Sequence, residues 1–228
     1  IHVGAMDPDE TIRLAQHACD IGADGVGIVT PAFFGTNPDA MVEYYVKVLH
    51  AIPQDFPAYL YNIPQLAAND LTSDTIGRIL EQCPNVAGIK YSYADMARTY
   101  EYLGISRDFE VVQGADSLFL PTLAMGCAGT VSGCSSVYPE PFVKIYEAFQ
   151  AGDMEAARGW QRLANKFVRA LGAGSNMAIF KSGLQYRGLM AGHMHRPQID
   201  LKEEQADELW KTLAALEEEC PEGLIIRD

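Results

Sequence analysis

The stretch Val86-Ala-Gly-Ile-Lys-Tyr-Ser92 decides how the rest of the chain is interpreted. It follows the turn signal Pro84-Asn85 and has the composition of a short buried strand. Side chains alternate along a strand, which predicts that Val86, Gly88 and Lys90 share one face. If that face lines a barrel, Gly88 leaves open space below the lysine. An amine in such a poorly solvated site has a lowered pKa and, when neutral, attacks a ketone to form a Schiff base. The commoner alternative is a lysine that ends a strand at the surface.

The composition is that of a globular protein, with 228 residues, 48% of them hydrophobic, and a formal net charge of −13. An acidic chain without a cluster of lysines and arginines is unsuited to nucleic acids and anionic membranes, so neither partner is expected. No apolar run approaches the roughly 20 residues that cross a bilayer. The opening Ile1-His2-Val3-Gly4 resembles the end of a strand and not a signal peptide. An odd number of cysteines without a Cys-x-x-Cys pair favours reduced thiols and a cytoplasmic location.

Strands and helices alternate up to residue 151. Six short strands are predicted at Ile1–Ala5, Gly25–Val29, Pro57–Tyr61, Val86–Lys90, Glu110–Gln113 and Gly129–Ser132. Helices are predicted at Asp7–Ile21, Pro38–Ala51, Ser73–Cys83, Ala94–Leu103, Asp116–Met125 and Tyr138–Gln150. Such alternation is typical of right-handed βαβ units and a parallel sheet. Three further helices, at Met154–Leu171, Ser175–Ala191 and Leu201–Glu219, predict a helical region over 152–228 that follows a barrel region over 1–151.

Two parallel-sheet architectures compete for this pattern. A doubly wound sheet is usually marked by a glycine-rich phosphate turn after its first strand, but Gly25-Val-Gly27 lies inside a strand. A (β/α)8 barrel places its chemistry at the carboxyl ends of its strands. Polar or small residues stand at those ends, namely Thr30, Tyr61, Lys90, Gly114 and Ser132. The barrel is therefore favoured, although it needs eight strands and six are predicted.

Tyr61 is the candidate for a proton carrier near Lys90. Tyr59 and Tyr61 share a face by alternation, and a phenol beside a Schiff-base lysine can shuttle protons during carbinolamine dehydration and carbon–carbon cleavage. The alternative is a core tyrosine with a satisfied hydroxyl. Asp116 is expected first as a helix cap and also as an acceptor for substrate hydroxyls. The strand end Gly129-Thr-Val-Ser-Gly133 would let the backbone approach a ligand closely.

His193 and His195 form a pattern that suggests a metal site. Zinc needs more ligands than two, no third one is nearby in the sequence, and Pro197 indicates a loop. A surface pair is therefore favoured, and no metal is expected.

Four motifs follow one another along the chain: Tyr61-Asn-Ile-Pro64, Gly88-Ile-Lys90, Gly114-Ala-Asp116 and Gly126-x-x-Gly129. In this order and spacing they resemble the dihydrodipicolinate synthase / N-acetylneuraminate lyase family. Its members are pyruvate-dependent class I aldolases and lyases with a (β/α)8 barrel and a C-terminal helical layer. The resemblance extends over essentially the whole chain. It implies that Lys90 is the Schiff-base lysine and Tyr61 the proton-shuttling tyrosine.

The resemblance also implies the surroundings of the substrate. The backbone at Val131 would lie near bound pyruvate, and the further expected contacts are Ser92, Phe33, Gly114, Asp116 and Thr130. No metal or organic cofactor is implied, because the imine itself is the electron sink. The family further implies a homo-oligomer, a dimer or a tetramer.

The chain departs from the family at its beginning. Members have two more βα units before a strand like Ile1–Ala5, and the second of these carries a Gly-Thr-Thr loop that holds the substrate carboxylate. We therefore expect the predicted strands to correspond to strands 3 to 8 of a longer protein. Roughly 70 further residues would precede them, because six strands cannot close an eight-stranded barrel.

Four positions bear on the identity of the substrate. Leu66 stands where dihydrodipicolinate synthases carry an arginine that binds the semialdehyde carboxylate, and Phe33 stands where they usually have the tyrosine of a hydroxyl relay. Ser117 replaces a glutamate of the sialic acid lyases, and Gly133 replaces a hydroxyl-bearing residue. Loss of a bidentate cation lowers the discrimination in favour of a dicarboxylic substrate.

The sequence thus predicts a Schiff-base lyase that cleaves or condenses a 2-oxo acid, pyruvate plus an aldehyde, with a sugar-acid type of substrate favoured. One alternative is a 4-hydroxy-tetrahydrodipicolinate synthase in which another cation replaces the missing arginine. A dehydratase or hydratase-aldolase that uses the same imine is another. Outside catalysis, the chain could be a family member that binds 2-oxo acids without turning them over, an alternative that Phe33 permits.

Overall fold

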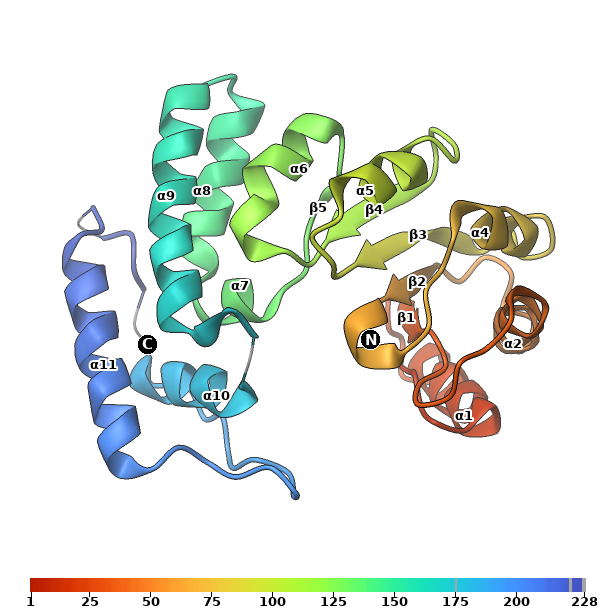
Figure 1. The fold of residues 1–228 in the computed structure, drawn as a ribbon, viewed down its shortest axis with the longest axis horizontal. Helices are drawn as coiled ribbons and strands as arrows, with labels where there is room; N and C mark the ends of the chain where they lie inside the picture. The colour runs from red at the N-terminus through yellow and green to blue at the C-terminus, as the bar shows by residue number, and fades with distance from the viewer. Residues whose placement is uncertain (175, 222, 227–228) are drawn as a thin grey trace. The chain divides into compact units, whose positions relative to one another are not determined.

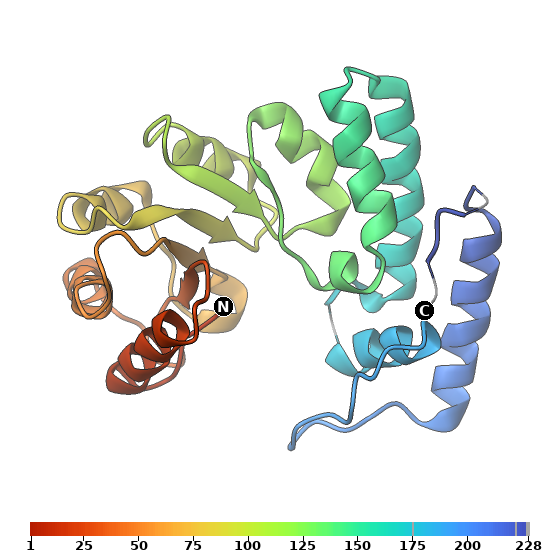
Figure 2. The same ribbon diagram turned by 180° about the vertical axis from the view of Figure 1, so that it is seen from behind.

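The computed structural model describes residues 1–174, 176–221 and 223–226, which form two compact units (Figure 1; Figure 2 shows them from behind). Unit 1 comprises Ile1–Gly114 and Met125–Gly129, and unit 2 comprises Ala115–Ala124 and Thr130–Asp228. The predicted boundary at residue 151, between a barrel region and the helices that follow it, differs from the boundary between these two units and stays a prediction.

Unit 1 is built on a parallel sheet whose strands follow one another in space in the order β1-β2-β3-β4-β5. The strands are β1 Val26–Val29, β2 Ala58–Asn62, β3 Val86–Tyr91, β4 Glu110–Gln113 and β5 Gly129–Thr130, whose last residue belongs to unit 2. The helices between them are α1 Pro8–Asp20, α2 Pro38–Leu49, α3 Pro64–Ala67, α4 Ser73–Leu80 and α5 Met96–Leu103. The predicted alternation and the parallel pairing of β1 to β4 are confirmed.

Most of these helices begin where the sequence provides a capping side chain. Asp7, Asn37, Thr72 and Asp95 each accept a hydrogen bond from a backbone N–H in the first turn of the helix that follows. Such a cap satisfies a donor that the helix leaves unpaired and is worth about 1 kcal/mol. The short α3 lies between the predicted elements, has no capping side-chain bond, and begins with Pro64.

One face of the sheet packs against the helices and forms the core of unit 1. Ile28, Leu60, Ile89 and Val111 are at most 1% exposed on this face. They form one cluster with helix side chains that include Ala15, Ala18, Tyr45, Val48, Leu49, Ile76, Ile79 and Tyr102. The opposite face, called the inner face below, carries Gly27, Val29, Tyr59, Tyr61, Gly88, Lys90, Glu110 and Val112.

The alternation predicted for Val86, Gly88 and Lys90 is wrong at Val86. The register of β2 and β3 shifts by one residue, so that Val86 pairs with Ala58 whereas Gly88 pairs with Tyr59. An extra residue in one strand transfers the side chains before it to the other face. Val86 consequently lies in the core on the helix side, and Gly88 and Lys90 keep the inner face.

The predicted first strand, Ile1–Ala5, pairs with β1 at a single position. The carbonyl of Ile1 accepts a hydrogen bond from the N–H of Gly27 (2.8 Å), and the N–H of Val3 donates to the carbonyl of Gly27 (3.0 Å). His2 therefore stands opposite Gly27 in a parallel bridge. Its side chain belongs to the same face as Gly27, the inner face.

Unit 2 is helical. Its elements are η1 Asp116–Leu118, α6 Phe119–Met125 (whose last residue belongs to unit 1), α7 Gly133–Val137, α8 Pro139–Gln150, α9 Met154–Ala170, η2 Gly172–Gly174, α10 Met177–Tyr186 and α11 Glu203–Glu218. The three helices predicted after residue 151 correspond to α9, α10 and α11. The predicted start of the second at Ser175 lies outside the described residues. It ends at Tyr186, earlier than predicted, because Gly188 turns the chain with a φ of 88°.

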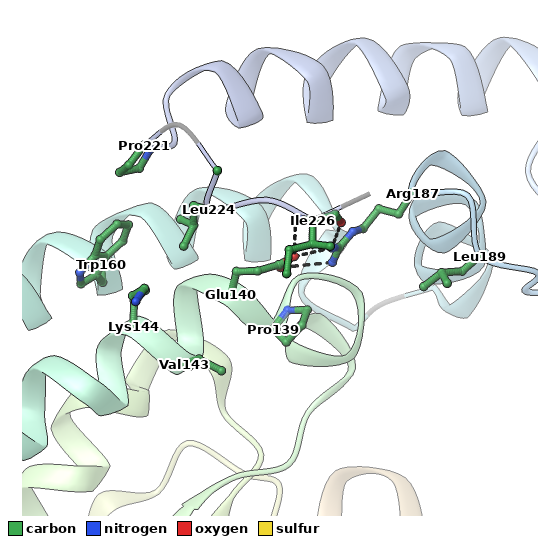
Figure 3. Close-up of a pocket in the computed structure, with 11 residues that line it drawn as sticks. Pro139, Glu140, Val143, Lys144, Trp160, Arg187, Leu189, Pro221, Leu224 and Ile226 are labelled. Carbon is green, nitrogen blue, oxygen red and sulfur yellow. Dashed lines mark hydrogen bonds and ion pairs between the residues drawn. The ribbon is translucent and has the colours of Figure 1, made fainter. Parts of the chain in front are cut away.

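A buried ion pair joins α8, the end of α10 and the last described residues of unit 2 (Figure 3). The side chains of Arg187 and Glu140 are 8% and 10% exposed. Arg187 also donates to the carbonyl oxygens of Val137 and Ile226, and the Glu140 carboxylate accepts a hydrogen bond from the N–H of Ile226 (3.2 Å). The pair lines a pocket of about 620 Å³ whose other walls are mostly apolar. A charge buried this deeply is tolerated because it is paired and hydrogen-bonded.

Gly88 has no room for a side chain. A Cβ at this position would lie 2.2 Å from the carbonyl oxygen of Glu110 and 2.9 Å from Cε1 of Tyr59. We expect Gly88→Ala to push β3 and β4 apart and to lower the free energy of unfolding by about 2 kcal/mol or more, as overpacking does. Gly27→Ala is the matched control, because a Cβ there meets no atom of the described residues within 4 Å. Chemical denaturation measures both variants, and equal stabilities would contradict this account of the packing.

The ion pair of unit 2 allows a second comparison. Glu140→Ala leaves the buried guanidinium of Arg187 without its counter-charge, and we expect it to lower the free energy of unfolding by about 3 kcal/mol. Lys144→Ala, one turn further along α8, removes a pair with Glu147 in which the side chains are 42% and 56% exposed. We expect little change there, because exposed pairs contribute little. Thermal unfolding compares the two, and a Glu140→Ala variant as stable as Lys144→Ala would show that the first pair is not buried in solution.

Candidate active site

The inner face of unit 1 carries two rows of residues that the parallel register lines up across the strands. The upper row, nearer the carboxyl ends, consists of Val29, Tyr61, Lys90 and Val112. The lower row, two residues earlier in each strand, consists of His2, Gly27, Tyr59, Gly88 and Glu110. The two residues predicted to carry the chemistry are thus partners within one row.

Lys90 and Tyr61 are in contact. The Nζ of Lys90 lies over the face of the Tyr61 ring, 4.2 Å from its centroid. The ring quadrupole attracts a cation in this position. Both side chains are partly buried, so the amine stands at the carboxyl end of the sheet with a phenol beside it. Their predicted roles as nucleophile and proton carrier stay predictions.

His2 stands next to this pair. Its ring meets that of Tyr61 nearly at a right angle, with the centroids 5.8 Å apart. Burial lowers the pKa of His2, and the positive charge of Lys90 lowers it further. A neutral imidazole is therefore favoured beside the lysine. His2 was not among the predicted site residues, although its place in the predicted strand Ile1–Ala5 put it on the same sheet.

The space expected below Lys90 is occupied. Tyr59 extends across Gly88, and its hydroxyl donates a hydrogen bond to the carboxylate of Glu110. Burial raises the pKa of Tyr59 to about 12, and the hydrogen bond to Glu110 contributes to the shift, so the hydroxyl stays protonated at neutral pH. The prediction of open space below Lys90 is therefore wrong: the missing side chain of Gly88 leaves room for the phenol ring of Tyr59.

Ser92 and Gly114 lie side by side where β3 and β4 end. A Cβ on Gly114 would lie 2.2 Å from the Oγ of Ser92, so the close approach requires a glycine. The carbonyl oxygen of Ser92 accepts a hydrogen bond from Nε2 of Gln65 on α3 (2.7 Å). The segment that follows Tyr61 is thereby tied to the segment that follows Lys90.

A hydrogen-bond network on the helix side supports the loop after Tyr61. Asn62 is fully buried, and its Nδ2 donates to the carboxylate of Asp70 (2.7 Å) and to the hydroxyl of Tyr102 (2.9 Å). Arg98 donates to the other carboxylate oxygen of Asp70 (2.9 Å). Buried polar networks of this kind rigidify their surroundings. The network fixes the direction in which the chain leaves β2.

Phe33 and Leu66 are both exposed, at 74% and 76%. Phe33 has a φ of 79°, a backbone conformation that is unfavourable for a residue other than glycine. Its ring packs edge-on against that of Phe34. Leu66 lies on α3. The predicted contact of Phe33 with a substrate stays a prediction.

Three of the predicted substrate contacts, Asp116, Thr130 and Val131, belong to unit 2. Asp116 does not cap the helix that it opens, because Ala115 is the N-cap there and makes no side-chain bond. Its carboxylate accepts a hydrogen bond from the hydroxyl of Ser132 instead. Burial raises the pKa of Asp116, and the bond from Ser132 opposes the shift. The predicted capping role is wrong, and the predicted contact with substrate stays open to test.

Metal-binding geometry is absent from the part of the chain that the structure describes, where no three His, Cys, Asp or Glu side chains gather closely enough to share an ion. His193 binds the carboxylate of Asp200 instead (2.8 Å), at the surface. All five cysteines are free thiols. Among the described helices, none is both long and apolar enough to cross a membrane.

Known proteins resemble this chain along most of its length. The model of the dihydrodipicolinate synthetase family matches residues 1–216. A protein of Halobacterium salinarum described as an uncharacterized DapA-like lyase is 36% identical over 214 residues, which are 94% of this chain and 69% of that protein. A 4-hydroxy-tetrahydrodipicolinate synthase of Methanospirillum hungatei is 30% identical over 213 residues, 92% of this chain and 72% of that protein.

A solved structure agrees with these matches. The 4-hydroxy-tetrahydrodipicolinate synthase of the thermoacidophilic methanotroph Methylacidiphilum fumariolicum SolV superposes with a TM-score of 0.87 at 27% identity, over 95% of this chain and 72% of that one. The strand order and the helices of unit 1 fit the (β/α)8 barrel that the sequence predicted. On these matches the chain belongs to the dihydrodipicolinate synthetase family, and it is a lyase of the pyruvate-dependent class I aldolase type.

Proposed function

We propose that Lys90 forms a Schiff base with pyruvate and that Tyr61 carries protons to and from the reacting atoms. The observation that supports this most directly is the contact of the two side chains, with the lysine Nζ 4.2 Å from the centroid of the phenol ring. Both residues stand at the carboxyl ends of adjacent parallel strands, where a barrel of this kind carries its chemistry.

The proposed reaction can be followed atom by atom. The neutral amine of Lys90 attacks C2 of pyruvate, and the resulting carbinolamine loses water to give the imine, with Tyr61 supplying the proton that leaves in the water. The phenolate of Tyr61 then takes a proton from C3 to give an enamine. The enamine carbon attacks the carbonyl carbon of the aldehyde and forms the new bond, and the aldehyde oxygen takes the proton back from Tyr61 and becomes a hydroxyl. Hydrolysis of the imine then releases the product and restores the lysine. Cleavage runs the same steps in reverse, with the imine as the electron sink.

His2 supports this proposal through its charge. The protonated imine is a cation, and a second cation beside it would oppose its formation. Burial and the charge of Lys90 lower the pKa of His2, which favours a neutral ring in contact with Tyr61. The iminium can therefore form without a like charge next to it.

We further propose that the aldehyde partner is polyhydroxylated, as in sugar acids. The position at which the resemblance places a carboxylate-binding arginine is Leu66, an exposed apolar side chain on α3. Ser92 offers a hydroxyl at the end of β3. The remaining proposed contacts are Gly114, Asp116, Phe33, Thr130 and, for the carboxylate end of pyruvate, the backbone at Val131.

The exposed apolar side chains of unit 1 favour a homo-oligomer, a dimer or a tetramer. Phe33 and Phe34 are in ring contact and are each at least 74% exposed, and neighbouring apolar side chains at a surface are typical of contacts between proteins. Leu66 is a further exposed apolar side chain. A cytoplasmic location remains part of the proposal, because the free thiols suit a reducing compartment.

A 4-hydroxy-tetrahydrodipicolinate synthase is the second candidate, because a relative with that name is 30% identical to this chain. It would need another cation to take the place of an arginine at Leu66. A family member that binds 2-oxo acids without turnover is the third, because Phe33 has no hydroxyl to offer a proton relay.

Borohydride trapping with pyruvate tests the proposed lysine. We expect a reduced pyruvyl adduct on Lys90, located by intact mass and peptide mapping, and no adduct in Lys90→Arg, because a guanidinium does not form the imine. Lys144→Arg, a surface position, should be trapped like the wild type. A folded wild-type protein that forms no adduct at Lys90 would remove the aldolase mechanism and leave a binding role.

A panel of aldehydes tests the proposed substrate class. With pyruvate, we expect the wild-type protein to use hydroxylated aldehydes in preference to an acid semialdehyde. Leu66→Arg should raise kcat/KM for the semialdehyde by about tenfold, because a charge-assisted hydrogen bond contributes about 1.5 kcal/mol or more. Leu66→Met, which adds no charge, should not. A wild-type preference for the semialdehyde would favour the synthase instead.

A further inference from the structure

Polar side chains fill the lower row of the inner face, directly beneath the residues proposed to carry the chemistry. Register pairs Gly27 with Tyr59, Tyr59 with Gly88, and Gly88 with Glu110. The row therefore alternates between a glycine and a large polar residue. A tyrosine and a glutamate at inward positions of a sheet call for an explanation, because such positions are usually filled by apolar side chains.

Tyr59 spans the strand that carries Lys90. The position of a Cβ on Gly88 would lie 2.9 Å from Cε1 of the Tyr59 ring, so the ring lies against the backbone of β3. Its hydroxyl reaches the carboxylate of Glu110 on β4, beyond that strand. Lys90 is two residues further along β3 on the same face, which places it one row above the ring.

The hydroxyl of Tyr59 keeps its proton at neutral pH. Burial and the bond to Glu110 raise the pKa of the Tyr59 hydroxyl to about 12. The phenol is therefore the donor of the hydrogen bond to Glu110. The ring is held at both ends, by its own strand and by β4.

We propose that Tyr59, anchored by Glu110, is a positioning residue for Lys90. The proposal rests on the proposed function of Lys90 as the Schiff-base lysine. The ring closes the space beneath the lysine, so the side chain of Lys90 cannot fold down along β3. The amine is left with the direction in which the structure has it, over the ring of Tyr61. Tyr61 is in contact with Lys90, and His2, Tyr59 and Glu110 share the inner face with it.

The test compares Tyr59→Phe and Glu110→Ala with Glu110→Gln in the full-length protein. The first two remove the hydrogen bond, and the third keeps an acceptor for it. We expect Tyr59→Phe and Glu110→Ala to slow borohydride trapping of pyruvate by about two- to tenfold, the effect of one hydrogen bond. The KM for pyruvate should change less than kcat. Glu110→Gln should remain close to the wild type.

The kinetics of the folded protein separate positioning from mere stability. A variant that only loses stability has less folded protein and unchanged kinetics in what remains, whereas a misplaced Lys90 slows imine formation in protein that is fully folded. The double variant should slow trapping no further than either single one, because both changes remove the same hydrogen bond. Tyr100→Phe is the control, an exposed tyrosine on α5 that should leave the trapping rate unchanged.

Each outcome has one interpretation. Failure to trap the wild-type protein at Lys90 overturns the proposed function itself. A trapped wild type together with an unchanged trapping rate in Tyr59→Phe, even with a lower melting temperature, would show that Tyr59 is structural and overturn the positioning role. If Tyr59→Phe does not fold, Glu110→Ala decides, because Glu110 is exposed and its removal takes away the anchoring hydrogen bond without taking away the ring. A wild-type trapping rate in Glu110→Ala overturns the proposal equally.

Discussion

Space on the inner face of the sheet is the constraint on which the site depends. Parallel strands are about 4.8 Å apart, so a ring that lies across a neighbouring strand needs a small residue on that strand, as Tyr59 does at Gly88. The lower row meets this limit with Gly27 between His2 and Tyr59, and with Gly88 between Tyr59 and Glu110. The side chains of the lower row therefore fill the space beneath the upper row. The contact between a lysine amine and a phenol ring follows from this division of space.

The candidate site residues that the sequence predicted were those set by local signals. The turn before Val86 and the apolar run after it located β3, and the rule that barrel chemistry lies at the carboxyl ends of strands selected Tyr61 and Lys90. The register shift between β2 and β3 leaves no such signal, so Val86 was assigned to the wrong face. The bond between Tyr59 and Glu110 joins residues 51 apart in the chain, and only the strand register brings them together.

In unit 2, a hydrogen bond to a residue distant in the sequence replaces the helix cap that the local sequence predicts. An aspartate at the start of a helix is a good capping residue, and Asp116 was predicted to have that role. The hydroxyl of Ser132, 16 residues further along, binds the carboxylate instead. The short α7 begins immediately after Ser132, which caps it. The bond to Asp116 and the cap of α7 both depend on the path that the chain takes after β5. Residue patterns within a few positions carry no information on that path.

The ion pair of Glu140 and Arg187 binds Ile226 through the backbone of that residue. Glu140 accepts from its N–H and Arg187 donates to its carbonyl, while its side chain is 64% exposed. Any amino acid except proline supplies both groups. Substitutions at 226 can therefore accumulate at little cost as the protein diverges, whereas 140 and 187 are coupled, since a change at one leaves a buried charge at the other. Related sequences should accordingly vary at different rates in this part of the chain: positions 140 and 187 should change together, whereas position 226 should accept most amino acids.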